Sequence, residues 1–134
     1  MINKLTYQVN DTIHAEELSE VFKASGIKRP VEDLPRLQQM IEHADLIITA
    51  RAEGRLVGVA RAITDFSYCC YLSDLAVDRN FQKCGIGKEL VRLLREELGE
   101  QVSLILLSAQ EAMDYYPKIG FDKIDNGYKI NRKS

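Results

Sequence analysis

The stretch AVDRNFQKCGIGKELVRLLREEL, residues 76–98, decides how the fold is interpreted. It begins with the end of a strand-like run, LSDLAV, contains a loop with two glycines, and ends in a segment whose apolar residues recur three and four positions apart. That spacing is typical of a helix that packs one face on a core. The stretch therefore predicts a strand, a glycine loop and a helix over residues 87–98 in direct succession.

The glycines of this loop would leave the start of the predicted helix open. The first N–H groups of a helix have no partner within it, and the aligned peptide dipoles make that end partly positive. Because Gly85 and Gly87 carry no Cβ, a phosphate group could approach those N–H groups, and Lys83 and Lys88 would add positive charge. The alternative is that the glycines only allow a tight turn between strand and helix.

Two well-known nucleotide-binding loops do not fit. The dinucleotide fingerprint G-x-G-x-x-G needs a third glycine where this chain has Leu90. The P-loop G-x-x-x-x-G-K-[ST] needs glycine where the chain has Gln82 and a hydroxyl residue where it has Glu89. Both patterns fail at positions that their chemistry requires.

The residues before this stretch predict two helices followed by a strand meander. A strand is predicted over residues 5–9, a helix over 14–25 that Gly26 would end, and a helix over 34–44 that Asp33 would cap. Two β-rich runs within residues 45–65 are then joined by Glu-Gly, as in a hairpin. A further strand is predicted over the nine residues CCYLSDLAV, which lead into the glycine loop.

The residues after the predicted helix complete the sheet. The run VSLILL, residues 102–107, is apolar without alternation, which is typical of a fully buried strand. The strands on either side of the helix are therefore expected to be parallel neighbours. A second crossover segment over residues 108–120 leads to a terminal hairpin with its turn at Asn126 and Gly127.

Length and charge limit the function classes. The chain has 134 residues, so one domain over residues 1–134 is expected. Eighteen basic and twenty acidic residues give a net charge of −2, which provides no broad basic surface for nucleic acid or anionic lipid. No long uncharged apolar run and no signal-peptide core are present. We therefore expect a cytoplasmic protein that binds neither nucleic acid nor membranes.

The cysteines and histidines do not form a metal-binding pattern. Cys69, Cys70 and Cys84 lack zinc-site spacing, and the first two are expected to point to opposite faces of a strand. His14 and His43 are isolated in helical segments and are expected to be solvated or capping residues. No metal site is therefore expected, and nucleophilic chemistry by a Cys/His pair is poorly supported.

Two motifs, in the right order, resemble a known family. The pattern Gln82-x-x-Gly85-x-Gly87 resembles the acetyl-CoA pyrophosphate loop of the GCN5-related N-acetyltransferases, the GNAT superfamily. Downstream, YYPKIGF at residues 115–121 is similar to that family's aromatic-Tyr-x-x-x-Gly-Phe segment. The resemblance implies an α+β fold: a mixed, mostly antiparallel sheet of about six to seven strands, flanked by about four helices, with a splayed parallel strand pair at the cofactor site.

The resemblance also implies a reaction and its residues. An acetyl group would pass from acetyl-CoA, the donor substrate, to a primary amine of a small molecule or protein. Tyr116 would be the general acid that protonates the CoA thiolate, because a phenol with a pKa near 10 keeps its proton at neutral pH. Asp74 is the nearest candidate for the general base, with ordered water as the alternative. The residues implied to bind acetyl-CoA are Leu75, Ala76, Val77, Gln82, Lys83, Cys84, Gly85, Ile86, Gly87 and Lys88.

The chain departs from the family pattern at two positions. The family often has glycine where this chain has Lys83, and often has asparagine, which helps to hold the CoA arm, where this chain has Ala109. Neither departure removes a group that the reaction needs. Tyr115 is expected to pack into the core as the aromatic partner of the motif.

Two other functions stay open beside catalysis. One is a CoA-binding module without turnover, acting as a sensor or partner subunit, and the other is a structural α/β domain with a chance glycine loop. The presence of Tyr116 with an intact loop favours the enzyme. Acceptor specificity in the superfamily comes largely from segments such as residues 25–33, which here mix both charge signs. Because many members pair their C-terminal strands or sheet edges, a homodimer is a further expectation.

Overall fold

A five-stranded sheet forms the centre of the molecule. The structure is a computed structural model that describes residues 4–133. In that part of the chain the strand order is β1-β2-β3-β4-β5, and all neighbours are antiparallel except β4 and β5, which are parallel. The strands are β1 (Leu5–Val9), β2 (Leu46–Ala52), β3 (Arg55–Thr64), β4 (Cys69–Val77) and β5 (Ser103–Ile105).

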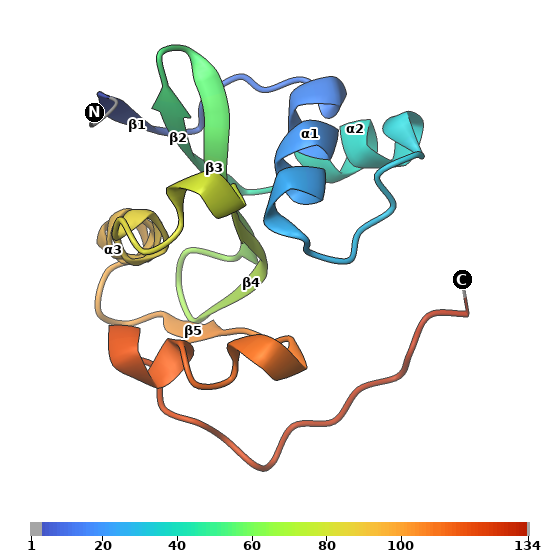
Figure 1. The fold of residues 1–134 in the computed structure, drawn as a ribbon. Helices are drawn as coiled ribbons and strands as arrows, with labels where there is room; N and C mark the ends of the chain where they lie inside the picture. The colour runs from blue at the N-terminus through green and yellow to red at the C-terminus, as the bar shows by residue number, and fades with distance from the viewer. Residues whose placement is uncertain (1–3, 134) are drawn as a thin grey trace.

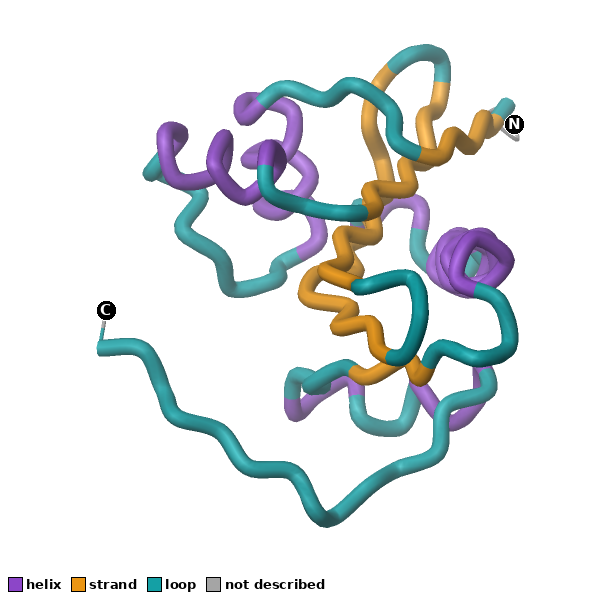
Figure 2. Tube along the Cα trace, turned by 180° about the vertical axis from the view of Figure 1, so that it is seen from behind, coloured by secondary structure: helices purple, strands orange, loops and turns teal. Residues whose placement is uncertain are grey.

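Helices cover both faces of this sheet. Helices α1 (Ala15–Ser25) and α2 (Leu34–Glu42) lie on one side, and α3 (Ile86–Leu98) lies on the other (Figures 1 and 2). Each side has its own buried cluster, with Leu18 and Phe22 on the α1 side, and Leu90 and Leu94 on the α3 side. The expected α+β fold with a mixed, mostly antiparallel sheet is confirmed, as is the parallel strand pair.

Local sequence signals account for the ends of the helices. His14 is the N-cap of α1, and its backbone N–H donates to Glu17 at 3.1 Å. Gly26 ends α1 with a left-handed φ of 83°. Asp33 caps α2 by accepting from the N–H of Arg36 at 3.2 Å. The starts of both helices and the end of α1 agree with the expected boundaries to within one residue, whereas α2 ends at Glu42, two residues earlier than expected.

The numbers of elements are slightly lower than expected. The described residues contain three α-helices, five strands and three short 3-10 helices, η1 (Arg79–Phe81), η2 (Gln110–Ala112) and η3 (Tyr116–Ile119). The expected second crossover over residues 108–120 forms η2 and η3 instead of one longer segment. Pro117 has no N–H to donate and fits only the first turn of a helix, so a new short helix begins there.

The expectations for the C-terminal strands were wrong. Residues 121–133 form no strand and run as an extended segment (Figure 1), so the hairpin at Asn126 and Gly127 is not present. An isolated two-stranded hairpin is only marginally stable, and the apolar side chains Tyr128 and Ile130 of this segment are fully exposed. The strand expected over residues 102–107 is short and partly exposed, because β5 lies at the edge of the sheet.

Candidate active site

One edge of β4 is only partly paired. Its first residues, 69–71, lie beside residues 103–105 of β5 in parallel register. Beyond them β5 gives no pairing, whereas β3 stays paired with β4 as far as Val77. In the described part of the chain, Leu75 and its two successors therefore present one row of backbone groups with no strand beside them.

A β-bulge lies near the point where β4 and β5 separate. Arg61 pairs with Asp74 and Ala62 pairs with Leu72, so Ser73 is an extra residue without a partner in β3. A bulge of this kind bends its strand and increases the local twist. The bulge therefore accounts for the divergence of the second half of β4 from β5.

The chain after β4 is tied back to the end of that strand. Asp78 is buried, and its carboxylate accepts from the N–H of Asn80 at 2.9 Å and pairs with Arg55 at 3.1 Å. The side-chain amide of Gln82 donates to the carbonyl of Val77 at 3.0 Å. These contacts fix the route of the glycine loop toward α3.

The glycine loop leaves the N-terminus of α3 open. Gly85 is the N-cap with a left-handed φ of 80°, and no side chain caps the helix. A Cβ on Gly85 would meet no heavy atom within 4 Å. Lys83 also has a left-handed φ, 67°, which is unfavourable for a residue with a long side chain. That conformation gives a physical reason for glycine at this position in other members of the family.

Gly87, in the first turn of α3, allows a close approach by Tyr115. A Cβ built on Gly87 would overlap the hydroxyl oxygen of Tyr115. Tyr115 is 37% exposed, so it does not simply pack into the core as expected. Instead its hydroxyl reaches the start of the helix. The motif did not predict this contact, because its aromatic position specifies a ring and not a hydroxyl group.

Tyr116 begins η3 and is partly buried among aromatic rings. Its ring makes edge contacts with Tyr115 and Phe121, with centroids 5.3 and 5.6 Å away. Burial raises the pKa of Tyr116 above its ordinary value, Tyr115 raises it further, and the Arg29 guanidinium opposes both effects. Tyr116 is therefore a protonated phenol at neutral pH and retains a proton that it could donate.

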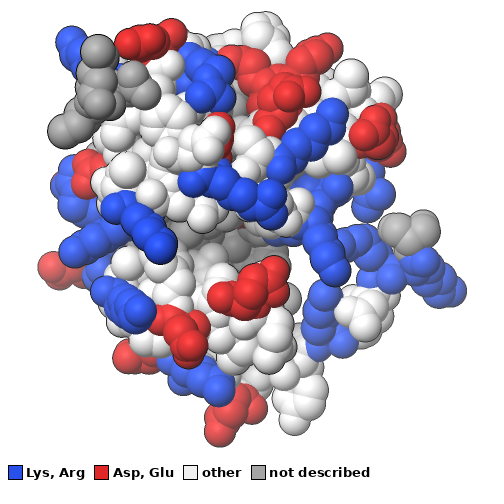
Figure 3. Space-filling view, viewed as in Figure 1, with Lys and Arg blue, Asp and Glu red and all other residues white. Residues whose placement is uncertain are grey.

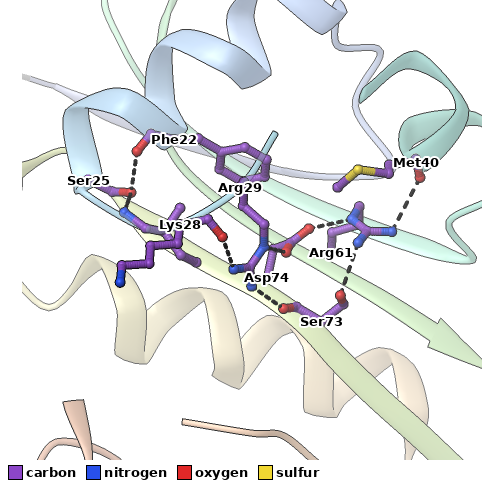
Figure 4. A network of polar contacts seen from close by, with 9 residues as sticks. Phe22, Ser25, Lys28, Arg29, Met40, Arg61, Ser73 and Asp74 are labelled. Carbon is purple, nitrogen blue, oxygen red and sulfur yellow. Dashed lines mark hydrogen bonds and ion pairs between the residues drawn. The ribbon is translucent and has the colours of Figure 1, made fainter. Parts of the chain in front are cut away.

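Asp74 lies at the centre of a buried network (Figure 4). Its side chain has no exposure to solvent, and one carboxylate oxygen accepts from Nε of Arg29 at 2.5 Å. The other oxygen accepts from Nε of Arg61. The pairing of both arginines with Asp74 was not predicted, because Arg29 is 45 positions away in sequence. We call these three residues the Asp74 cluster.

The remaining predicted binding residues divide by exposure. Ala76 and Ile86 have side chains buried in the cores, so only their backbone groups can reach a ligand. Lys83, Cys84 and Lys88 are exposed around the glycine loop. The structure thus has the open edge of β4 at one end of the glycine loop and the open start of α3 at its other end.

The surface near these elements is hollowed and carries both charge signs. In the view of Figure 3, basic side chains border a hollow near the middle of the molecule, and acidic side chains lie below it. A separate groove of about 610 Å³ runs along α3 and includes Gly85, Lys88 and Ile119 but no residue of β4. We base the site on the open β4 edge and the start of α3, because that groove contains only Gly85 and Lys88 of the predicted binding residues.

Residues 4–133 contain neither a grouping of metal ligands nor a helix suited to a membrane. In this range no three His, Cys, Asp or Glu side chains are grouped so as to hold a metal ion. None of the described helices is long and apolar enough to cross a membrane.

Known proteins resemble this chain in sequence and fold. It is 28% identical over 129 residues to GCN5-related N-acetyltransferase 1, chloroplastic, of Arabidopsis thaliana. The matched region covers 93% of this chain and 64% of the Arabidopsis protein. It is 30% identical over 127 residues to an uncharacterized N-acetyltransferase of Pyropia yezoensis, covering 90% of this chain and 71% of that protein. The chain thus spans somewhat less than two thirds of the Arabidopsis relative.

The fold is similar to that of solved acetyltransferases. An aminoglycoside N-acetyltransferase in complex with CoA superposes with a TM-score of 0.74 at 16% identity, over 100% of this chain and 98% of that one. Residues 12–121 match the sequence profile of the Acetyltransferase (GNAT) family. The chain therefore belongs to the GNAT acetyltransferase family.

Proposed function

We propose that this chain is an N-acetyltransferase that transfers an acetyl group from acetyl-CoA to a primary amine. The observation that carries the proposal is the unpaired edge of β4 that leads, through one short loop, to the open N-terminus of α3. An extended pantetheine arm needs backbone partners, and a pyrophosphate needs unpaired N–H groups. Family membership supports both assignments.

The donor would be held mainly by backbone groups. We infer that Leu75, Ala76 and Val77 pair with the pantetheine arm as an added strand would. The N–H groups of the first turn of α3 would bind the pyrophosphate, and the exposed Lys83 and Lys88 would add positive charge. The hydroxyl of Tyr115, close to Gly87, is placed to give this end of the helix one additional donor.

We assign the general acid to Tyr116. When the amine nitrogen attacks the thioester carbonyl carbon, the C–S bond breaks and negative charge develops on sulfur. The protonated phenol of Tyr116 can pass its proton to that sulfur. A backbone N–H of β4 could stabilise the oxyanion, and one such donor contributes about 3 kcal/mol in other enzymes.

We do not retain Asp74 as the general base. Both carboxylate oxygens already accept guanidinium N–H groups, and the side chain is fully buried. Ordered water, the alternative considered from the sequence, remains as the route by which the acceptor ammonium loses its proton. A neutral amine is the attacking species in either case.

Calorimetric titration of the purified chain with acetyl-CoA tests the proposal. We expect Gly85→Glu to abolish binding, because it places bulk and negative charge at the start of α3. The control is Gly99→Glu at the other end of α3, where φ is 81° and a Cβ likewise meets no heavy atom within 4 Å, although its ψ of −179° differs from the 10° at Gly85. A wild-type chain that does not bind acetyl-CoA, or equal loss in both variants, would overturn the proposal.

Turnover separates the enzyme from a CoA-binding sensor. Wild-type protein with acetyl-CoA would be incubated with a panel that contains an aminoglycoside, an arylalkylamine and a lysine-containing peptide, and released CoA thiol would be measured. Acceptor-dependent release is expected for an enzyme. Tight binding without release for any amine in a broad panel would favour the sensor.

A further inference from the structure

The Asp74 cluster connects three parts of the molecule, one of which is the strand with the open edge. Asp74 lies in β4, Arg61 lies in β3, and Arg29 lies in the loop between α1 and α2. Arg61 also donates to the carbonyl of Met40 in α2 at 3.4 Å. Figure 4 shows both guanidinium groups directed toward the Asp74 carboxylate from opposite sides.

Both arginines also donate hydrogen bonds to Ser73, the extra residue of the bulge. Ser73 has no partner in β3, so its polar groups need other partners. Arg29 Nη2 donates to the carbonyl of Ser73 at 2.8 Å, and Arg61 Nη2 donates to its hydroxyl at 3.0 Å. Arg29 Nη1 donates in addition to the carbonyl of Lys28 in its own loop, at 2.6 Å. One guanidinium group therefore fixes the loop and the bulge to each other.

We propose that Arg29 is a positioning residue for the transfer reaction: it holds the α1–α2 loop against the β4 bulge, and so keeps the open edge of β4 in the orientation that receives acetyl-CoA. This inference rests on the proposed function. The bulge at Ser73 comes directly before the open residues of β4, so a change in its twist would move Leu75 and its neighbours together.

The positive charge of Arg29 also lowers the pKa of the proposed general acid, Tyr116. The charged or titratable groups that act on Tyr116 are Tyr115 and Arg29, and Arg29 is in turn paired with Asp74. The Asp74 cluster contains two guanidinium groups and one carboxylate, so its net charge is positive. Removal of Arg29 would therefore raise the pKa of Tyr116 as well as release the loop.

A purely structural role is the alternative to be separated from positioning. Arg51 provides the control, because its guanidinium is likewise held by carboxylates, in its case Asp11 at 2.8 Å and Glu17 at 2.7 Å. Its side chain is 19% exposed, against 25% for Arg29, but it lies in β2 and contacts neither β4 nor Tyr116 in these interactions. Loss of either arginine removes a similar ion pair from the fold.

The experiment compares wild type, Arg29→Gln, Arg29→Lys and Arg51→Gln with three measurements. Hydrogen exchange would report peptides that cover residues 26–33 and 70–78, calorimetry would report acetyl-CoA affinity, and tyrosine-ring NMR would report the titration of Tyr116. Because Arg29 is partly exposed and Asp74 keeps Arg61 as a partner, the Arg29 variants should fold. Circular dichroism checks that they do.

For Arg29→Gln we expect exchange in both peptides to become about tenfold faster, affinity for acetyl-CoA to fall about tenfold, and the Tyr116 pKa to rise. Arg29→Lys should recover part of each effect. Lysine can pair with Asp74, but it has no second guanidinium nitrogen to donate to the carbonyl of Ser73. Arg51→Gln should leave all three readouts as in wild type.

Unchanged exchange and affinity in Arg29→Gln, or the same changes in Arg51→Gln, would overturn the inference. Failure of the proposed function has a different signature, because wild type itself would then not bind acetyl-CoA while the exchange comparison would still report the contact between loop and bulge.

Discussion

The two halves of β4 differ in what lies beside them. Cys70 and Tyr71 are paired on both sides, by β3 and by β5, whereas Leu75, Ala76 and Val77 are paired only by β3 in the described part of the chain. The bulge at Ser73 separates the two halves. One strand can thus complete the sheet at one end and offer backbone groups to a ligand at the other, because a single extra residue redirects it.

The junction of the two halves should be the most sensitive point. Asp74→Ala would leave Arg29 and Arg61 without their shared carboxylate, and removal of one partner from a buried ion pair costs about 3 kcal/mol or more. We expect a loss of that size in the free energy of unfolding, measured with urea. Glu96→Ala removes an exposed partner of Arg92 as the control and should cost less than about 1 kcal/mol. Equal small losses would mean that the Asp74 cluster does not stabilise the junction.

In the proposed site, which includes the open half of β4, the reaction should depend on Tyr116 of η3. Tyr116→Phe removes the proposed acid but keeps the ring, so kcat should fall about 100-fold while affinity for acetyl-CoA changes less than about twofold. Steady-state kinetics with the acceptor found in the panel, together with calorimetry, would measure both. Tyr71→Phe is the control, since Tyr71 is exposed in the paired half of β4. Unchanged kcat in Tyr116→Phe would remove this residue from the mechanism.

The contact between the open half and α3 can be changed at Gly58. Gly58 pairs with Val77, and a Cβ there would lie 2.9 Å from Ile86 and 3.3 Å from Leu90. Gly58→Ala should therefore overpack the interface and lower the unfolding free energy by about 1–3 kcal/mol, with weaker acetyl-CoA binding because the start of α3 shifts. Gly127→Ala meets nothing within 4 Å and should change neither quantity. Full stability in Gly58→Ala would show that α3 can move without cost.

The pH dependence of turnover follows from the protonation of Tyr116. Its protonated form is the active one in the proposed mechanism, and burial raises its pKa above the ordinary value near 10. Activity due to this group should therefore be complete at neutral pH and lost only as the pH rises through that higher pKa. A kcat that fell with rising pH between about 7 and 9 in wild type and stayed flat in Tyr116→Phe would contradict the raised pKa, and the same fall in both proteins would show that another group limits the reaction.

The smallest expected effect is at Lys83. Its φ of 67° is unfavourable for a residue with a Cβ, so Lys83→Gly should stabilise the fold by less than about 1 kcal/mol once the entropy of glycine is considered. Thermal unfolding would measure the gain. Asn10→Gly is the contrasting variant and should destabilise the fold, since asparagine accepts its own φ of 55° more readily and its side chain accepts a hydrogen bond from the N–H of Ile47 at 3.1 Å. Clear destabilisation by Lys83→Gly would indicate that the lysine side chain has a structural contact.

Features with local causes could be predicted from the sequence. Gly26 and Asp33 mark the helix ends because their conformations and side chains serve adjacent backbone groups. The bounds of β4 were predictable from the local sequence as well. So was the hairpin at Glu53 and Gly54, where both turn residues adopt positive φ. The family motif identified the glycine loop and Tyr116.

Features that depend on distant residues could not be predicted. The Asp74 cluster joins a loop residue, Arg29, to a strand residue, and the local sequence around either residue does not indicate the other. The hydroxyl of Tyr115 meets Gly87 only because η3 returns to α3. Turn residues at Asn126 predicted a hairpin that is not formed, because a turn signal does not provide a surface on which the strands can pack.

Amide chemical shifts during titration with acetyl-CoA test the difference between the two halves of β4 most directly. In a two-dimensional NMR experiment on ¹⁵N-labelled protein, we predict that acetyl-CoA shifts the amides of residues 75–77 and 86–88 and leaves those of residues 69–71 in place. Shifts confined to residues 69–71, or no shift in residues 75–77 and 86–88 at saturating acetyl-CoA, would contradict the assignment of the open edge as the donor site.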